Sequence, residues 1–96
     1  MKAKKIILQL LRIHKAELAK QFRVKSLALF GSYARGDQRR GSDVDILVNV
    51  DPAIGLEFVS LAEQLEVILH RKVDLVSTRA LTAPYRRLIE HDAIYV

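Results

Sequence analysis

The sequence contains no cysteine, which excludes disulfide bonds and metal sites built from thiolates. No apolar run approaches the roughly 20 residues that a membrane-spanning helix requires. The N-terminal region is basic, but Gln9, Arg12 and Glu17 interrupt its apolar positions, which is not the pattern of a signal peptide. We therefore expect a protein that spans no membrane and remains in the cytoplasm.

Aromatic residues are scarce: the chain has three Phe, three Tyr and no Trp. It also has no basic–aromatic strand motif of the kind that stacks RNA bases, so we do not expect direct binding of nucleic acid. The net charge of +5, from 16 Lys and Arg against 11 Asp and Glu, favours phosphate-rich or acidic partners. Charge alone does not distinguish such a role from an ordinary soluble basic surface.

Hydrophobic residues make up 50% of the 96-residue chain and charged residues 28%, which is a globular composition. The length suits one domain with one core, and no repeat, low-complexity tract or linker divides it. We therefore expect a single domain over residues 1–96.

The spacing of apolar residues predicts the secondary structure. Residues 3–22, 55–70 and a segment after Pro84 have helical spacing, whereas 26–30, 43–50 and 72–76 are typical of strands. Residues 93–96 could add a final edge strand. These elements predict an α+β fold, with a small mixed β-sheet of three to four strands and helices packed on it.

The region between the first two strands has the character of a binding site. Gly31 and Ser32 follow the first strand directly, where a sharp turn lets another group approach the backbone closely. Ser32 could also cap a short helical turn over 33–37, whose free N–H groups would face a phosphate. At the start of the second strand, Asp43 and Asp45 are separated by one residue, so strand alternation places both carboxylates on the same face.

A third carboxylate, Asp74, lies in an otherwise apolar strand. The first two strands are joined without a crossover helix, which favours antiparallel pairing. The third strand follows a helix of crossover length, which favours parallel pairing through a right-handed connection. This topology brings Asp43, Asp45 and Asp74 to the same end of the sheet as the turn at Gly31 and Ser32.

Such a cluster suits magnesium chemistry. Mg²⁺ prefers oxygen ligands from one or two carboxylates plus substrate phosphates, and paired ions activate an attacking oxygen and stabilise a leaving one. We expect Asp43 and Asp45 to bind and bridge two Mg²⁺ ions. Asp74 would bind the ion beside the attacking hydroxyl and lower the pKa of that hydroxyl or accept its proton. Gly31 and Ser32 would contact a triphosphate through backbone N–H groups and the serine hydroxyl.

Basic residues of the same region complete the expected nucleotide site. Arg35 would neutralise charge on the phosphates, with a weaker expectation for Arg39 or Arg40. Each feature also has a structural explanation, because Gly-Ser pairs form ordinary turns and an Asp-x-Asp pair can serve capping. Asp74 can be a charge that deters edge-strand aggregation, and Arg35 can form a surface ion pair. Their occurrence together favours the functional interpretation.

Two segments resemble the signature of a known family. Residues 31–36 read GSYARG and residues 42–48 read SDVDILV. This combination resembles the minimal nucleotidyltransferases (MNT) of the DNA polymerase β-like superfamily, and the resemblance extends over nearly the whole chain. Asp74 lies where these proteins carry a third carboxylate. The resemblance implies a polymerase β-like nucleotidyltransferase core and an enzyme that transfers a nucleoside monophosphate to a hydroxyl with two divalent ions.

The same resemblance implies a biological setting. Many stand-alone MNT proteins are MntA-like antitoxins paired with a HEPN-domain ribonuclease toxin. They transfer AMP from ATP onto a toxin tyrosine, or block the toxin by binding. By resemblance we expect a protein adenylyltransferase with ATP as donor, a HEPN toxin as partner and a hetero-oligomeric complex. Composition and spacing by themselves show neither the donor nor the partner.

Two alternatives remain open. One is a nucleotidyltransferase whose acceptor is a small molecule or an RNA end carried by another chain. The other is a toxin-binding antitoxin without turnover. The three carboxylates argue against the second alternative, because a protein that only binds has no need of such a cluster.

Overall fold

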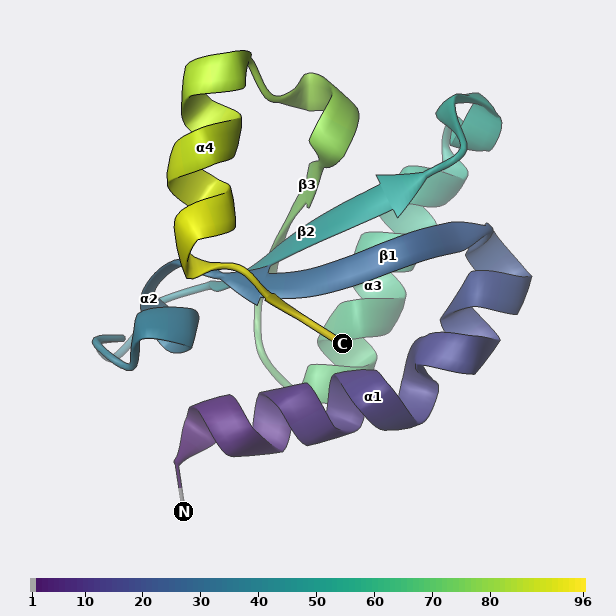
Figure 1. Cartoon of the computed structure of the whole chain (residues 1–96). Coiled ribbons are helices and arrows are strands. Elements are labelled where there is room, and N and C mark those ends of the chain that lie inside the picture. The colour runs from purple at the N-terminus through teal and green to yellow at the C-terminus, as the bar shows by residue number, and fades with distance from the viewer. Residues whose placement is uncertain (1) are drawn as a thin grey trace.

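The computed structural model describes residues 2–96 (Figure 1). Its elements are, in chain order, α1 (Ala3–Phe22), β1 (Val24–Phe30), α2 (Gly31–Arg35), β2 (Val44–Val50), the 3-10 helix η1 (Pro52–Ile54), α3 (Glu57–Leu69), β3 (Val73–Ser77), the 3-10 helix η2 (Thr78–Ala80), α4 (Ala83–Asp92) and β4 (Ile94–Tyr95).

The strands form one mixed sheet in the order β3-β2-β1-β4. β1 pairs antiparallel with β2, and β2 pairs parallel with β3, as the connections between them predicted. β4 pairs antiparallel with the other side of β1 and forms an edge of the sheet. The expected α+β fold with a small mixed sheet is therefore confirmed.

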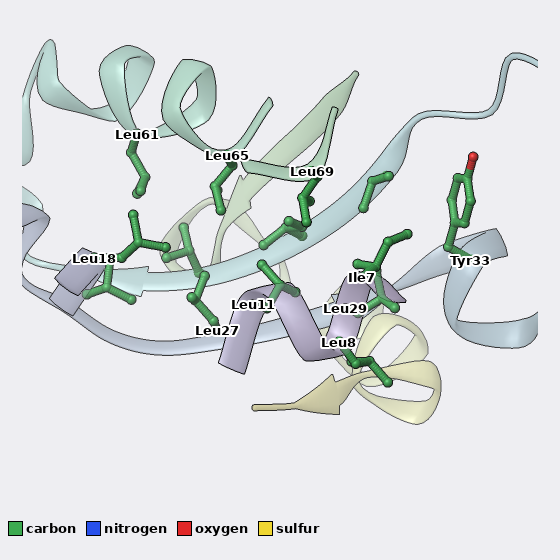
Figure 2. Close-up of a cluster of buried hydrophobic side chains, with 14 of the residues drawn as sticks. Ile7, Leu8, Leu11, Leu18, Leu27, Leu29, Tyr33, Leu61, Leu65 and Leu69 are labelled. Carbon is green, nitrogen blue, oxygen red and sulfur yellow. The ribbon is translucent and has the colours of Figure 1, made fainter. Parts of the chain in front are cut away.

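The hydrophobic core lies on one face of the sheet, between the strands and the helices α1 and α3. Each helix turns one apolar side inward, at the i, i+4 spacing that places residues on one face. Figure 2 shows these side chains meeting over β1, and the fully or almost fully buried helical residues are Ile7, Leu11, Leu18, Leu61, Leu65 and Leu69. Within residues 2–96, no helix combines the length and the apolar character needed to cross a membrane.

Alternation along β2 determines which face each side chain occupies. Val44, Ile46 and Val48 are all 0% exposed and lie in the core. Successive strand side chains point to opposite faces, so Asp45 projects from the face opposite to this core. Packing of the aliphatic residues therefore sets the direction of the carboxylate.

Several element boundaries differ from the prediction by one or two residues, including the short helix expected over 33–37, which is α2 at Gly31–Arg35. Two of the shifts have a clear local cause. β1 begins at Val24 rather than residue 26, because Arg23 adopts a left-handed conformation (φ 56°) that ends α1 in a single residue. α3 begins at Glu57 rather than residue 55, because η1 precedes it. Asp51 initiates η1 by accepting a hydrogen bond from the N–H of Ala53 at 2.8 Å.

The helix α4 contributes no buried residue to the core. Figure 1 shows it on the opposite side of the sheet from α1, with its C-terminal end near α2. Tyr85 and Leu88, which lie on its apolar side, remain 64% and 69% exposed. The position of α4 therefore depends on polar contacts and on its continuation into β4.

Truncation in α3 tests the inward-facing side of that helix. Leu65 is 0% exposed, so Leu65→Ala should lower the free energy of unfolding by about 2–5 kcal/mol through lost burial and a residual cavity. Val67 is 66% exposed, and Val67→Ala should change it by no more than about 0.5 kcal/mol. Urea unfolding followed by circular dichroism measures both variants, and similar losses in the two would contradict the helix orientation.

Candidate active site

The site begins where β1 passes directly into α2. Gly31 follows the last residue of β1 with φ +74°, a conformation that favours glycine. A Cβ added there would lie 2.9 Å from Cγ of Asp45 and would overlap its Oδ2. The carboxylate of Asp45 thus rests against the bare Cα of Gly31, and no larger residue fits between them. This contact joins the two predicted halves of the site.

Register across the sheet places a second carboxylate beside the first. Asp45 is paired with Asp74 on β3 and with Phe30 on β1. Asp43 immediately precedes β2 and lies exposed, as does Asp74, whereas Asp45 is partly buried. The structure therefore brings Asp45 and Asp74 side by side at the end of the sheet where the turn at Gly31 lies.

Electrostatics show that these acids lie within range of one another. The pKa of Asp45 is raised above its ordinary value, first by burial and then by the negative charges of Asp74 and Asp43. The positive charge of Arg35 acts in the opposite direction. The ionised form of Asp45 is therefore disfavoured unless a cation compensates it.

The donor set fits a hard divalent ion. Mg²⁺ usually takes one or two protein carboxylates and completes its coordination with water and substrate phosphates. Residues 2–96 contain no group of three or more Asp, Glu, His or Cys side chains that by itself forms a metal-binding cluster. Asp45 with its neighbours Asp43 and Asp74 would supply oxygen ligands and negative charge, and a substrate would supply the remaining ligands.

Ser32 has a different structural role from the one predicted. It is the second residue of α2, and the position before the helix is occupied by Phe30, so the expectation that Ser32 caps a following turn is wrong. Its carbonyl accepts hydrogen bonds from the N–H groups of Gly36 at 2.8 Å and Asp37 at 3.0 Å. The side chain of Tyr33 is buried and anchors α2. The guanidinium of Arg71 lies 5.8 Å from the centroid of its ring.

Arg35 lies at the last position of α2 and forms two charged contacts. Its Nε donates to Asp37 Oδ2 at 3.1 Å, and its Nη1 donates to Asp92 Oδ2 at 2.9 Å. These partners raise the pKa of Arg35, and Arg35 lowers the pKa of Asp92. Sequence reasoning missed Asp92, because it belongs to no motif and lies at the end of α4.

The loop between α2 and β2 holds the other basic candidates. Arg39 and Arg40 are exposed, and neither forms an ion pair within residues 2–96. The N–H of Arg39 donates to Ser42 Oγ at 2.9 Å, which closes the loop just before Asp43. Gln38 was not predicted as a site residue, yet its Oε1 is buried without a hydrogen-bond partner among the described residues.

The site joins a strand, a glycine turn and a short helix, and it faces carboxylates on two neighbouring strands. This is the architecture of a nucleotidyl-transfer enzyme. The family model described as "Nucleotidyltransferase domain" matches residues 11–95 of the chain. The protein therefore belongs to the nucleotidyltransferase domain family, and the resemblance seen in the sequence is confirmed.

Known proteins similar to this chain agree with that assignment. A relative from Methanocaldococcus jannaschii, provisionally named a protein adenylyltransferase, is 46% identical over 101 residues that cover 100% of both chains. A solved structure, provisionally described as a minimal nucleotidyltransferase, has a TM-score of 0.80 at 29% identity and covers 98% of this chain and 95% of its own. A toxin–antitoxin crystal structure with AMP-PNP has a TM-score of 0.68 at 29% identity, covering 96% of this chain and 70% of the other.

The contact between Gly31 and Asp45 can be tested with a matched pair of glycine variants. Gly31 and Gly36 both have positive φ, but an added Cβ at Gly36 meets nothing within 4 Å. Gly36→Ala should therefore lower the free energy of unfolding by about 1–2 kcal/mol from backbone strain alone. Gly31→Ala should lower the free energy of unfolding clearly more than Gly36→Ala does. Adding Asp45→Ala to Gly31→Ala should remove this additional loss. Equal losses in the two glycine variants, measured by urea unfolding, would contradict the contact.

Neutralising Asp45 should stabilise the metal-free protein at neutral pH. The folded-state pKa of Asp45 is raised above 3.8, so folding is penalised at pH values above the raised pKa and not below the unfolded-state value. Asp45→Asn should therefore raise the melting temperature at pH 7 in EDTA, and this gain should disappear as the pH falls through the raised pKa toward 3.8. Thermal unfolding across pH 3–8 measures the effect, and a variant less stable than wild type at pH 7 would contradict it.

Proposed function

We propose that this protein transfers AMP from ATP to a tyrosine hydroxyl of a cognate HEPN-domain ribonuclease toxin and so acts as its antitoxin. The observation that carries the proposal is the adjacency of Asp45 and Asp74 at the Gly31 turn, where burial and neighbouring negative charges raise the pKa of Asp45. The protein would act in the cytoplasm, with ATP as donor and two Mg²⁺ ions as cofactor.

The roles of the residues follow from their places in the site. Asp43 and Asp45 would hold the Mg²⁺ ions, which would supply positive charge to the triphosphate and to the attacking oxygen. The bare Cα of Gly31 leaves room for the carboxylate of Asp45. The backbone N–H of Gly31 and the hydroxyl of Ser32 donate to phosphate oxygens. The guanidinium of Arg35, within electrostatic range of Asp45, offsets charge on the same phosphates.

The transfer step is an in-line displacement at the α-phosphorus of ATP. The acceptor oxygen forms a bond to this phosphorus as the bond to the bridging oxygen of the β-phosphate breaks, and pyrophosphate leaves with that electron pair. The proton of the acceptor hydroxyl passes to Asp74, which lies exposed beside Asp45 on the neighbouring strand. An exposed base is accessible to a hydroxyl delivered by a second protein.

The choice of acceptor is supported by the similar proteins and by the resemblance of the sequence. The relative from Methanocaldococcus jannaschii is named for transfer to protein, and the similar crystal structure with AMP-PNP is that of a toxin–antitoxin pair. The exposed Tyr85 and Leu88 of α4 fit contact with another protein. This last observation also suits the alternative of an antitoxin that binds its toxin without modifying it.

An assay with labelled nucleotide separates these alternatives. The protein is incubated with α-labelled ATP, MgCl₂ and the product of its neighbouring gene, which is tested as the HEPN toxin. Label should pass to the toxin, and Asp43→Asn or Asp45→Asn should reduce transfer at least about 100-fold, because metal binding contributes several kcal/mol to the transition state. Ser32→Ala should weaken transfer by about tenfold, the value of one hydrogen bond to a charged group.

Glu63→Gln is the matched control for charge, because Glu63 is exposed on α3 outside the site. It should transfer label as wild type does. A tight complex without label would support the binding antitoxin in place of the enzyme. Label on RNA or a small molecule, with none on protein, would support the alternative of a nucleotidyltransferase that acts on one of these acceptors. Full turnover by Asp45→Asn would show that the metal assignment is wrong.

A further inference from the structure

The guanidinium of Arg35 connects two segments that are distant in sequence. Asp37 lies in the loop directly after α2, whereas Asp92 is the last residue of α4. The contact to Asp92 is the shorter of the two, at 2.9 Å against 3.1 Å to Asp37. Arg35 therefore joins the end of α4 to the helix that begins at Gly31.

The two contacts use only part of the guanidinium. Nε and one N–H of Nη1 point at carboxylates, and Nη2 takes part in neither contact. A guanidinium has five N–H donors in one plane, so an arginine held in this way retains donors for a phosphate oxygen. The carboxylates therefore orient the side chain without saturating it.

Asp92 is well placed to perform this orientation. Its side chain is 26% exposed against 60% for Asp37, so it is the less solvated of the two partners. The helix that carries it has no buried residue, and a further polar contact, from Arg86 Nη2 to the carbonyl of Thr78 at 2.7 Å, fixes its other end. His91, beside Asp92, also faces this carboxylate, at 3.4 Å from Nδ1 to Oδ1.

We propose that Asp92 is a positioning residue that holds Arg35 in the orientation in which it contacts the triphosphate of bound ATP. This inference rests on the proposed function, because it assigns Arg35 to the nucleotide. Asp92 itself touches neither nucleotide nor acceptor. It restricts the rotation of the long, exposed Arg35 side chain before ATP binds. Less conformational entropy is then lost on binding.

The experiment measures the dissociation constant of ATP by isothermal titration calorimetry in MgCl₂, with the whole protein. Asp92→Ala should weaken ATP binding by about fivefold, which is the cost of ordering one long side chain on binding. Asp92→Asn keeps an acceptor oxygen and should show a smaller loss. Glu90→Gln removes an exposed carboxylate of the same helix and should bind as wild type does.

A double-mutant cycle with Arg35 separates positioning from a general structural effect. In a chain that already carries Arg35→Ala, the further change Asp92→Ala should cause no additional loss of affinity. An equal loss in both backgrounds would overturn the proposal and assign Asp92 a merely structural role. In the transfer assay the loss should appear in KM for ATP rather than in kcat.

The outcomes distinguish this inference from the proposed function. If the wild-type protein binds ATP and Asp92→Ala binds it equally well, the positioning role is wrong while the nucleotide site stands. If the wild-type protein does not bind ATP in the presence of MgCl₂, the proposed function fails and the positioning role fails with it. Melting temperatures of all variants, measured in parallel, show that each is folded.

Discussion

The close approach of Asp45 to Gly31 is the contact on which the rest of the site depends. It requires a backbone conformation that favours glycine and a position without a side chain, both at the residue that directly follows β1. The same contact partly buries a carboxylate next to two others, which disfavours its charge. A fold maintains such an arrangement only where the surrounding packing determines it.

That packing comes from the opposite face of the sheet. Val44, Ile46 and Val48 lie in a core closed by α1 and α3, and a shift of β2 by one residue would bury its carboxylate and expose these aliphatic side chains. The parallel pairing of β2 with β3 then places Asp74 directly beside Asp45. Hydrophobic burial on one face therefore sets the geometry of the charged groups on the other.

The side of the sheet on which α4 lies is less firmly packed. α4 has exposed apolar residues and is connected to the site through Asp92 and Arg35, two residues at the surface. Contacts of this kind contribute little to stability, since exposed ion pairs are weakened by water and salt. They do restrict the direction of a side chain, and the proposed role of Arg35 toward a triphosphate depends on this restriction. A protein partner seated on α4 would lie next to the same pair.

The sequence by itself determined the main helices, the strands, the antiparallel and parallel pairings, and the glycine, serine and aspartates expected at the site. These follow from local signals: apolar period, connection length, and a motif whose residues lie close together in the chain. Tertiary structure alone decided that Asp45 rests on Gly31, that Ser32 lies within α2 rather than capping it, and that α4 leaves Tyr85 and Leu88 exposed. It also paired Arg35 with Asp92, because the contacts of a long side chain depend on which distant segments the folded core brings within its reach.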